Sequence, residues 1–131
     1  METIKERFER TAGAPPTTGE ELRASVPAAV RAVFEVEPLY RALFATAAGR
    51  EMHRATSGDR SASVESAFTD GLDGMEARER RLLVSLLYLV TSSKSVLWLK
   101  DYMGLEVDEV IDAVSMAVEL LRAPLDEGRQ P

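Results

Sequence analysis

Apolar residues recur at helical spacing along most of this chain, and no segment shows the sustained apolar–polar alternation of a half-buried strand. Leu39 and Leu43 lie four residues apart, as do Val110 and Val114, so each pair falls on one face of a helix. Proline occurs only six times and leaves long stretches uninterrupted. This periodicity predicts an all-α fold, a multi-helix bundle.

Capping signals predict where helices begin. Thr17 with Glu20 has the spacing of a capping box, in which each side chain satisfies a backbone amide at the helix start. Asp73 with Glu76 repeats that spacing before the fifth of seven expected helices. We therefore expect one helix to begin at Thr17 and another shortly after Asp73.

Stop signals predict where helices end or break. A break is expected at Gly49, and the polar segment 56–61 is expected to form a loop. Thr91–Ser93 breaks or re-caps the chain after the fifth helix, and Gly104 ends the sixth. Pro124 is expected to end the last helix.

These boundaries divide the chain into three parts. Residues 1–16 form an N-terminal helix and linker, residues 17–123 form a helical domain, and residues 124–131 form a loose tail. A chain of 131 residues is long enough to bury a core without disulfides or metals.

The segment Leu82–Val90 is apolar on nearly every side of a helix. A helix that is apolar all round is buried all round. In a chain this small, we expect one face of this helix to meet the core and another to meet a second subunit.

The composition excludes several classes of function. The net charge is −6, which opposes binding to nucleic acid because phosphates require Lys and Arg. Cysteine is absent, which excludes thiol catalysis, and His53 is the only histidine, too few for a metal site. The sequence contains no glycine-rich phosphate loop or nucleophile elbow, so we expect no cofactor, no metal and no catalytic residue.

No targeting or membrane segment is expected. Residues 1–7 are polar where a signal peptide is apolar, and the run at 82–90 is too short to span a bilayer. The sequence therefore predicts a cytoplasmic protein without a membrane partner.

The second half of the chain resembles a known family. Residues 80–93 join an arginine-rich helix start to a long apolar stretch that ends in Thr-Ser-Ser. Residues 97–105 end in Gly-Leu, and residues 113–118 have the pattern Ala-Val-x-x-Ala-Val. Together with residues 37–44, these segments make residues 20–122 similar to the C-terminal ligand-binding and dimerisation domain of TetR-type transcription regulators.

The resemblance implies an all-helical bundle in which two late helices of each subunit pair across a dimer interface, while inner helices surround an apolar effector pocket. The residues expected at the interface are Leu83, Val84, Leu87, Val110, Ala113, Val114, Ala117 and Leu121. The residues expected to line the pocket are Phe34, Tyr40, Phe44, Met52, His53, Phe68, Tyr88, Trp98 and Tyr102.

Each candidate has a simpler alternative. Aromatic residues at helical spacing are more often core than ligand contacts, although Tyr88, Trp98 and Tyr102 each join an apolar body to a hydrogen-bonding tip. His53 is better explained as a partly exposed helix residue than as a polar anchor in a pocket. The carboxylates at 106–112 suit the positive end of a helix dipole better than acid–base chemistry.

The predicted function is that of a small-molecule sensor that forms a homodimer, binds an apolar or aromatic effector and moves its N-terminal helix in response. Too few residues precede Pro15 for a helix-turn-helix, so the chain is not expected to bind DNA by itself. Two alternatives remain open: a stand-alone protein that pairs with and modulates a full-length TetR-type regulator, and an enzyme that has adapted the pocket.

Overall fold

The computed structural model describes residues 4–128, with side chains described for residues 6–52, 54 and 65–123. These residues contain helices and no strand, which confirms the predicted all-α fold. The helices are α1 (Ile4–Ala12), α2 (Gly19–Glu35), α3 (Glu37–Phe44), α4 (Ala47–Thr69), α5 (Ala77–Thr91), α6 (Ser93–Met103) and α7 (Val107–Gly128).

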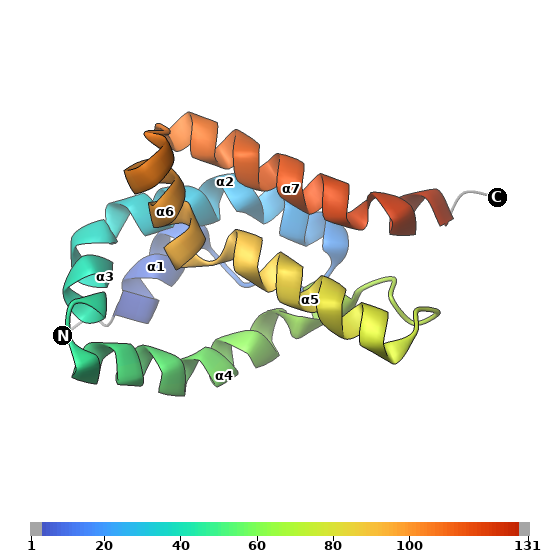
Figure 1. Ribbon diagram of the computed structural model, residues 1–131, viewed down its shortest axis with the longest axis horizontal. Coiled ribbons are helices and arrows are strands. Elements are labelled where there is room, and N and C mark those ends of the chain that lie inside the picture. The colour runs from blue at the N-terminus through green and yellow to red at the C-terminus, as the bar shows by residue number, and fades with distance from the viewer. Residues whose placement is uncertain (1–3, 129–131) are drawn as a thin grey trace.

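Helix α2 is the centre of the bundle. It contacts α1, α4, α6 and α7, and α7 in turn lies along α5. In Figure 1, α7 and α2 run together along the top, α5 crosses the middle and α4 forms the lower edge. The short helix α3 turns the chain between α2 and α4, so that α3 and α6 lie at the same end of the molecule (Figure 1).

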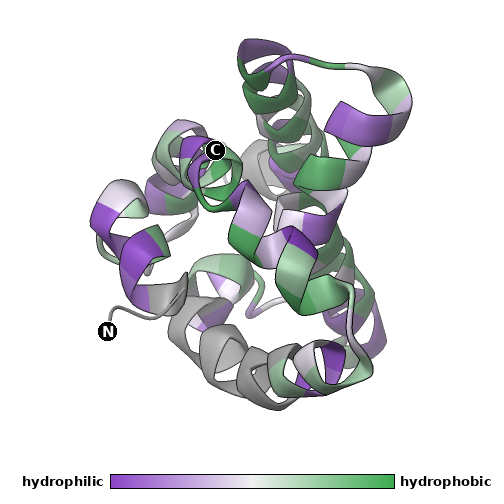
Figure 2. Cartoon of the chain, turned by 90° about the vertical axis from the view of Figure 1, so that its left-hand side faces the viewer, coloured by the Kyte–Doolittle hydropathy of each residue, from purple (hydrophilic) through white to green (hydrophobic). Residues whose placement is uncertain are grey.

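The core is mostly aliphatic. Successive turns of α2 bury an apolar stripe, as the spacing of these residues predicts, and α7 supplies a second stripe. Hydrophobic residues nevertheless occur on most helical turns, mixed with hydrophilic ones (Figure 2). The most buried core residues of α2, α5 and α7 are Leu22, Val26, Val30, Val33, Leu87, Val110, Val114 and Val118.

The break between α3 and α4 falls earlier than predicted. Thr46 caps α4 by accepting a hydrogen bond from the amide of Gly49 (2.9 Å). Gly49 is buried inside the first turn of α4, where a Cβ would overlap the carbonyl oxygen of Leu43. The glycine thus permits close approach of two helices rather than a break. The predicted loop at 56–61 is wrong, because α4 runs through it without interruption.

The capping box of α2 lies one residue later than predicted. Thr18, not Thr17, is the N-cap, and it exchanges hydrogen bonds with Glu21. The amide and hydroxyl of Thr17 also donate to the Glu21 carboxylate, and these bonds lower the pKa of Glu21. Both registers fit the sequence pattern. The observed register places Gly19 in the first turn, where it packs against α7.

The predicted ends of the later helices are partly confirmed. Gly104 adopts the left-handed conformation (φ 66°) that ends α6, and Ser92 re-caps the chain by accepting from the amide of Ser95. The cap predicted at Asp73 is wrong, because Glu76 is the N-cap of α5 and makes no side-chain capping bond. The end predicted at Pro124 is wrong, because α7 continues past it to Gly128.

The bend at Ser92 also bears on membrane insertion. No single helix among residues 4–128 has the length and apolar composition to cross a membrane. Helices α5 and α6 reach that composition only as a pair, and they are bent by 55° relative to each other.

Candidate functional site

The residues predicted to line one pocket lie in several separate places. Phe44, Trp98 and Tyr102 come together along a groove between α3 and α6. Phe68 and Tyr88 form an edge-to-face ring pair with centroids 5.1 Å apart, away from that groove. The Tyr88 hydroxyl is enclosed and makes no hydrogen bond to the described protein atoms.

The remaining residues that were predicted to line the pocket also lie in different environments. Tyr40 is buried beneath the groove and stacks on Phe44, with ring centroids 5.7 Å apart. Phe34 is half-buried and lies under the ammonium of Lys100. Met52 is exposed on α4, and the side chain of His53 lies outside the described residues. The structure therefore brings only part of the predicted set together.

The groove between α3 and α6, called the aromatic groove below, encloses about 400 Å³. That volume is in the range of small-molecule sites. Trp98 and Tyr102, whose rings lie 5.4 Å apart, remain 51% and 75% exposed. The described residues that line the aromatic groove are Arg41, Phe44, Ala45, Lys94, Leu97, Trp98, Asp101 and Tyr102.

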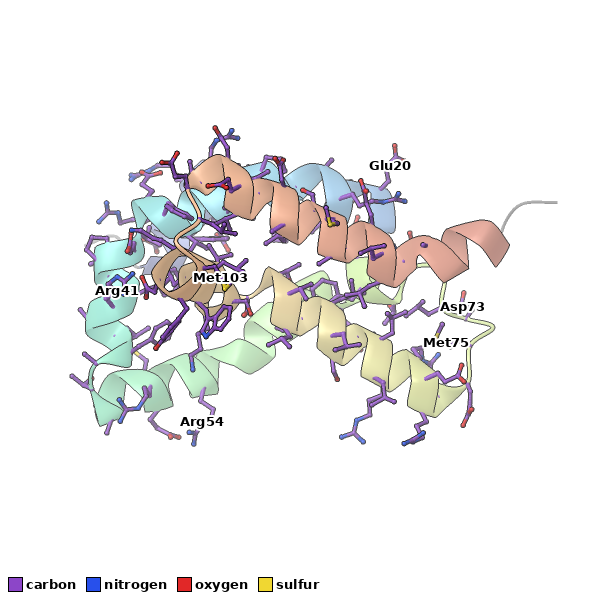
Figure 3. The ribbon with its side chains drawn as sticks, turned by 45° about the horizontal axis from the view of Figure 1, so that its top comes forward. Glu20, Arg41, Arg54, Asp73, Met75 and Met103 are labelled. Atoms are coloured by element: carbon purple, nitrogen blue, oxygen red, sulfur yellow. The ribbon has the colours of Figure 1, made fainter. Side chains whose placement is uncertain are left out.

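Helical periodicity explains how α6 supplies most of this lining. Lys94 and Trp98 are four residues apart, and Asp101 and Tyr102 follow one turn later, so all four share a face. Figure 3 shows Arg41 projecting from α3 at the end of the molecule where α6 lies. The groove is thus formed by one face of each helix.

Glu37 fastens α3 to α6 at the edge of the aromatic groove. Its carboxylate accepts hydrogen bonds from the ammonium of Lys100 (2.6 and 2.7 Å) and from the guanidinium of Arg41 (2.6 and 2.9 Å). The bonds from Lys100 and Arg41 hold the pKa of Glu37 below its ordinary value of 4.5, although burial acts in the opposite direction. Glu37 is therefore ionised and fully engaged at neutral pH.

Arg41 extends this network across the groove. Its two terminal nitrogens donate to the two oxygens of Asp101, at 2.7 and 3.1 Å, in the paired geometry that suits guanidinium and carboxylate. The hydrogen bonds to Asp101 and Glu37 raise the pKa of Arg41, and those from Arg41 lower the pKa of Asp101. All three groups keep their charges and hold one another in place.

Lys94 differs from the other cations of the groove. Its ammonium lies 5.0 Å from the centre of the Phe44 ring, an attractive cation–π distance. Within the described part of the chain, no carboxylate pairs with it. Among the described residues, the groove therefore presents one positive charge that no ion pair neutralises.

A second exposed surface lies on α5 and α7, which pack side by side. We call it the leucine face. Its large apolar side chains are each between 46% and 67% exposed and recur three or four residues apart. It consists of Leu82, Leu86 and Leu89 on α5 and Met116 and Leu120 on α7.

The predicted interface residues lie beside the leucine face rather than on it. Leu87, Val110 and Val114 are enclosed by the chain's own core, so they offer no surface to a partner. The large exposed apolar side chains of α5 and α7 lie at positions other than the predicted interface residues. The other predicted residues are half-buried: Leu83, Val84, Ala113, Ala117 and Leu121.

A buried arginine joins the start of α2 to the end of α7. Arg122 is 1% exposed, and its guanidinium donates to the carbonyl oxygen of Asp70 at 3.0 Å. The carboxylate of Asp70 accepts from the amide of Gly19 at 2.8 Å. A Cβ on Gly19 would overlap the guanidinium, so the absence of a side chain there makes room for Arg122.

Among the described residues, no group of three or more His, Asp or Glu side chains is placed to hold a metal ion. Comparisons with protein families, curated proteins and solved structures find no match to this chain. The resemblance to TetR-type regulators stays a prediction from the residues.

Sequence reasoning missed the charged half of the aromatic groove. Glu37, Arg41 and Asp101 look like ordinary surface charges in the sequence, because Arg41 and Asp101 are 60 residues apart. Only the placement of α3 against α6 brings them together. Lys94 carried one usable signal, since it lies four residues before Trp98 and thus on the same helical face.

Proposed function

We propose that this chain is a dimerising, small-molecule-binding regulatory domain of the TetR type. The observation that carries the proposal is the leucine face, a ridge of exposed apolar side chains along two adjacent helices. Large exposed apolar surface is typical of interaction sites on soluble proteins. The resemblance of the sequence to a domain that pairs through two late helices supports the same conclusion.

A second copy of the chain is the occupant that fits this face best. Two such faces related by a two-fold axis would stack α5 and α7 against their symmetry mates as a four-helix layer. Each half-exposed leucine or methionine would contribute about 1 kcal/mol on burial. Ten such side chains, five from each copy, are enough to offset a substantial part of the cost of association.

The aromatic groove is the proposed effector site. Its lining helix α6 is joined directly to α5 at Ser92 and to α7 by the turn at Gly104. A ligand that prefers one position of α6 would therefore bias the arrangement of the two helices that form the leucine face. By linkage, dimerisation would change ligand affinity by the same factor.

The proposal assigns no DNA contact to this chain by itself. Its net charge of −6 opposes association with phosphates. A regulatory output would then require a DNA-binding unit or a partner protein, and the expected location is the cytoplasm.

Sedimentation equilibrium of the purified chain tests the proposal. We expect a mass of twice the chain mass of 14.4 kDa at micromolar concentration. A monomer throughout the micromolar range would refute dimerisation. Repeating the run with a saturating aromatic ligand tests the linkage, since an unchanged dissociation constant would disconnect the groove from the leucine face.

A further inference from the structure

We propose that the aromatic groove binds a flat aromatic anion, with its ring against Trp98 and Tyr102 and its acid group beside Lys94. This inference rests on the proposed small-molecule site and narrows it to one chemical class. The ligand would carry at least one aromatic ring and a carboxylate or similar acid.

The exposed rings indicate the aromatic part of the ligand. A half-exposed tryptophan beside a tyrosine that is three-quarters exposed leaves a large apolar surface in contact with water. The ring of Phe44, which also lines the groove, stacks on the buried ring of Tyr40. Aromatic rings pack favourably in offset or edge-to-face arrangements, so a flat ring is well suited to this surface.

The ion pairs of the groove indicate that the ligand carries an acid group. Glu37 is occupied by Lys100 and Arg41, and Asp101 is occupied by Arg41. Every carboxylate oxygen of Glu37 and Asp101 accepts a hydrogen bond from a charged donor. The ammonium of Lys94, in contrast, lies over the ring of Phe44 and has no carboxylate partner among the described residues. An ammonium has three donor hydrogens, so Lys94 can bind an anion while it remains over the ring.

A cationic ligand is the main competitor, because exposed aromatic rings also attract cations. Here the Phe44 ring already carries the ammonium of Lys94, which would repel a second positive charge. Asp101, the one carboxylate among the described residues that line the groove, is bound to Arg41 through both of its oxygens. Charge complementarity therefore favours an anion over a neutral or cationic ligand of the same shape.

Three probes of one shape test this preference: para-phenylbenzoate, para-phenylbenzamide and para-phenylbenzylammonium. Trp98 is the only tryptophan of the chain, so its fluorescence reports groove occupancy directly, and calorimetry gives the affinities. We expect the anion to bind about fivefold more tightly than the amide, and the ammonium more weakly than both.

The substitution Lys94→Met removes the charge and keeps an apolar stem of similar length. We expect it to abolish the preference for the anion and leave the affinity for the amide unchanged. The control Arg31→Met removes one positive charge outside the groove lining and should preserve the preference. Trp98→Leu, followed by calorimetry, should weaken all three probes together.

The results separate two kinds of failure. Equal binding of the three probes, or an anion preference that survives Lys94→Met, would overturn the assignment of an aromatic anion and leave a small-molecule groove in place. Failure of all three probes to alter Trp98 emission or release heat at millimolar concentration would overturn the groove as the ligand site. Dimerisation, which is measured on the protein without probe, is independent of both results.

Discussion

The aromatic groove and the leucine face both expose large apolar side chains, yet their surroundings are opposite. The groove is enclosed on two sides by helices and bordered by a network that joins Glu37, Arg41 and Asp101. The leucine face consists of exposed apolar side chains on two neighbouring helices, α5 and α7, which run in opposite directions (Figure 1). A concave charged site suits a small ligand, and an apolar ridge suits another protein surface.

The difference teaches that exposure alone does not assign a function to an apolar residue. Trp98 at 51% and Leu82 at 50% are almost equally exposed. What separates them is the chemistry of their neighbours, which includes an available ammonium in one case and further leucines in the other. This contrast leads to four tests, in order of decreasing expected effect.

The largest effect is expected from charges placed on the leucine face. The double substitution Leu86→Glu with Met116→Glu would bury four like charges in a two-fold dimer interface. We expect the dissociation constant of the dimer to rise at least about a hundredfold, because unpaired charges are expensive to bury. Sedimentation equilibrium measures the change. Met52→Glu, an exposed methionine on α4, is the matched control and should leave the mass unchanged.

Gly19→Ala tests the scaffold that both surfaces share. The added methyl group would displace the guanidinium of Arg122, which is buried and hydrogen-bonded to Asp70. We expect a loss of about 1–3 kcal/mol in the free energy of unfolding, measured with urea. Gly74→Ala is the control, since a Cβ there meets no other atom. Equal stability of the two variants would contradict the close packing at Gly19.

Glu37→Gln tests the charge network of the groove. Because the folded protein lowers the pKa of Glu37, its contribution to stability is present above the unfolded value of about 4.5. That contribution is lost as the pH falls through the lowered pKa. At pH 7 we expect the variant to be about 1 kcal/mol less stable than the wild type.

The difference between Glu37→Gln and the wild type should shrink as the pH falls below about 4.5, where the carboxyl of the unfolded chain takes up a proton, and should vanish once the pH has passed through the lowered pKa of the folded carboxyl. Glu65→Gln, which changes an exposed carboxylate on α4, is the control and should have little effect at any pH. A constant difference across the pH range would show that Glu37 acts through packing rather than charge.

The smallest effect is expected from ionic strength, which should act differently on ligand binding in the groove and on association through the leucine face. Raising the ionic strength from 0.05 M to 0.5 M should weaken binding of an aromatic anion in the groove by about two- to threefold, because partly exposed charges are screened. Association through the leucine face should stay constant or tighten slightly, because burial of apolar surface is not screened. The same salt response at both surfaces would remove the distinction between them.

Much of the fold was predictable because it depends on local signals. The apolar spacing in α2 and α7, the cap at Ser92 and the stop at Gly104 each act within a few residues. One error fell where two local solutions were equally good. Thr17 and Thr18 both precede a glutamate at the capping distance, and only the packing of Gly19 against Arg122 selects one.

The candidate site was less predictable than the fold, because it depends on contacts between helices rather than on local signals. The aromatic residues of the groove could be named, because Trp and Tyr stand out in a sequence with few of them. The sequence could not tell which of these residues are buried in the core and which line the groove, because burial depends on which helix packs against each ring. Tyr40 and Tyr102 illustrate this, with exposures of 4% and 75%.

The sequence by itself determined that this chain is helical, that α5 ends near Ser92 and α6 at Gly104, and that the fifth helix is apolar on more faces than one core can cover. Helical period and capping chemistry are properties of neighbouring residues, so they can be read without a fold. Only the tertiary structure decided which side of α5 is left exposed and which charges meet at Glu37. Those outcomes depend on the relative rotation of packed helices, which is set by contacts between residues far apart in the chain.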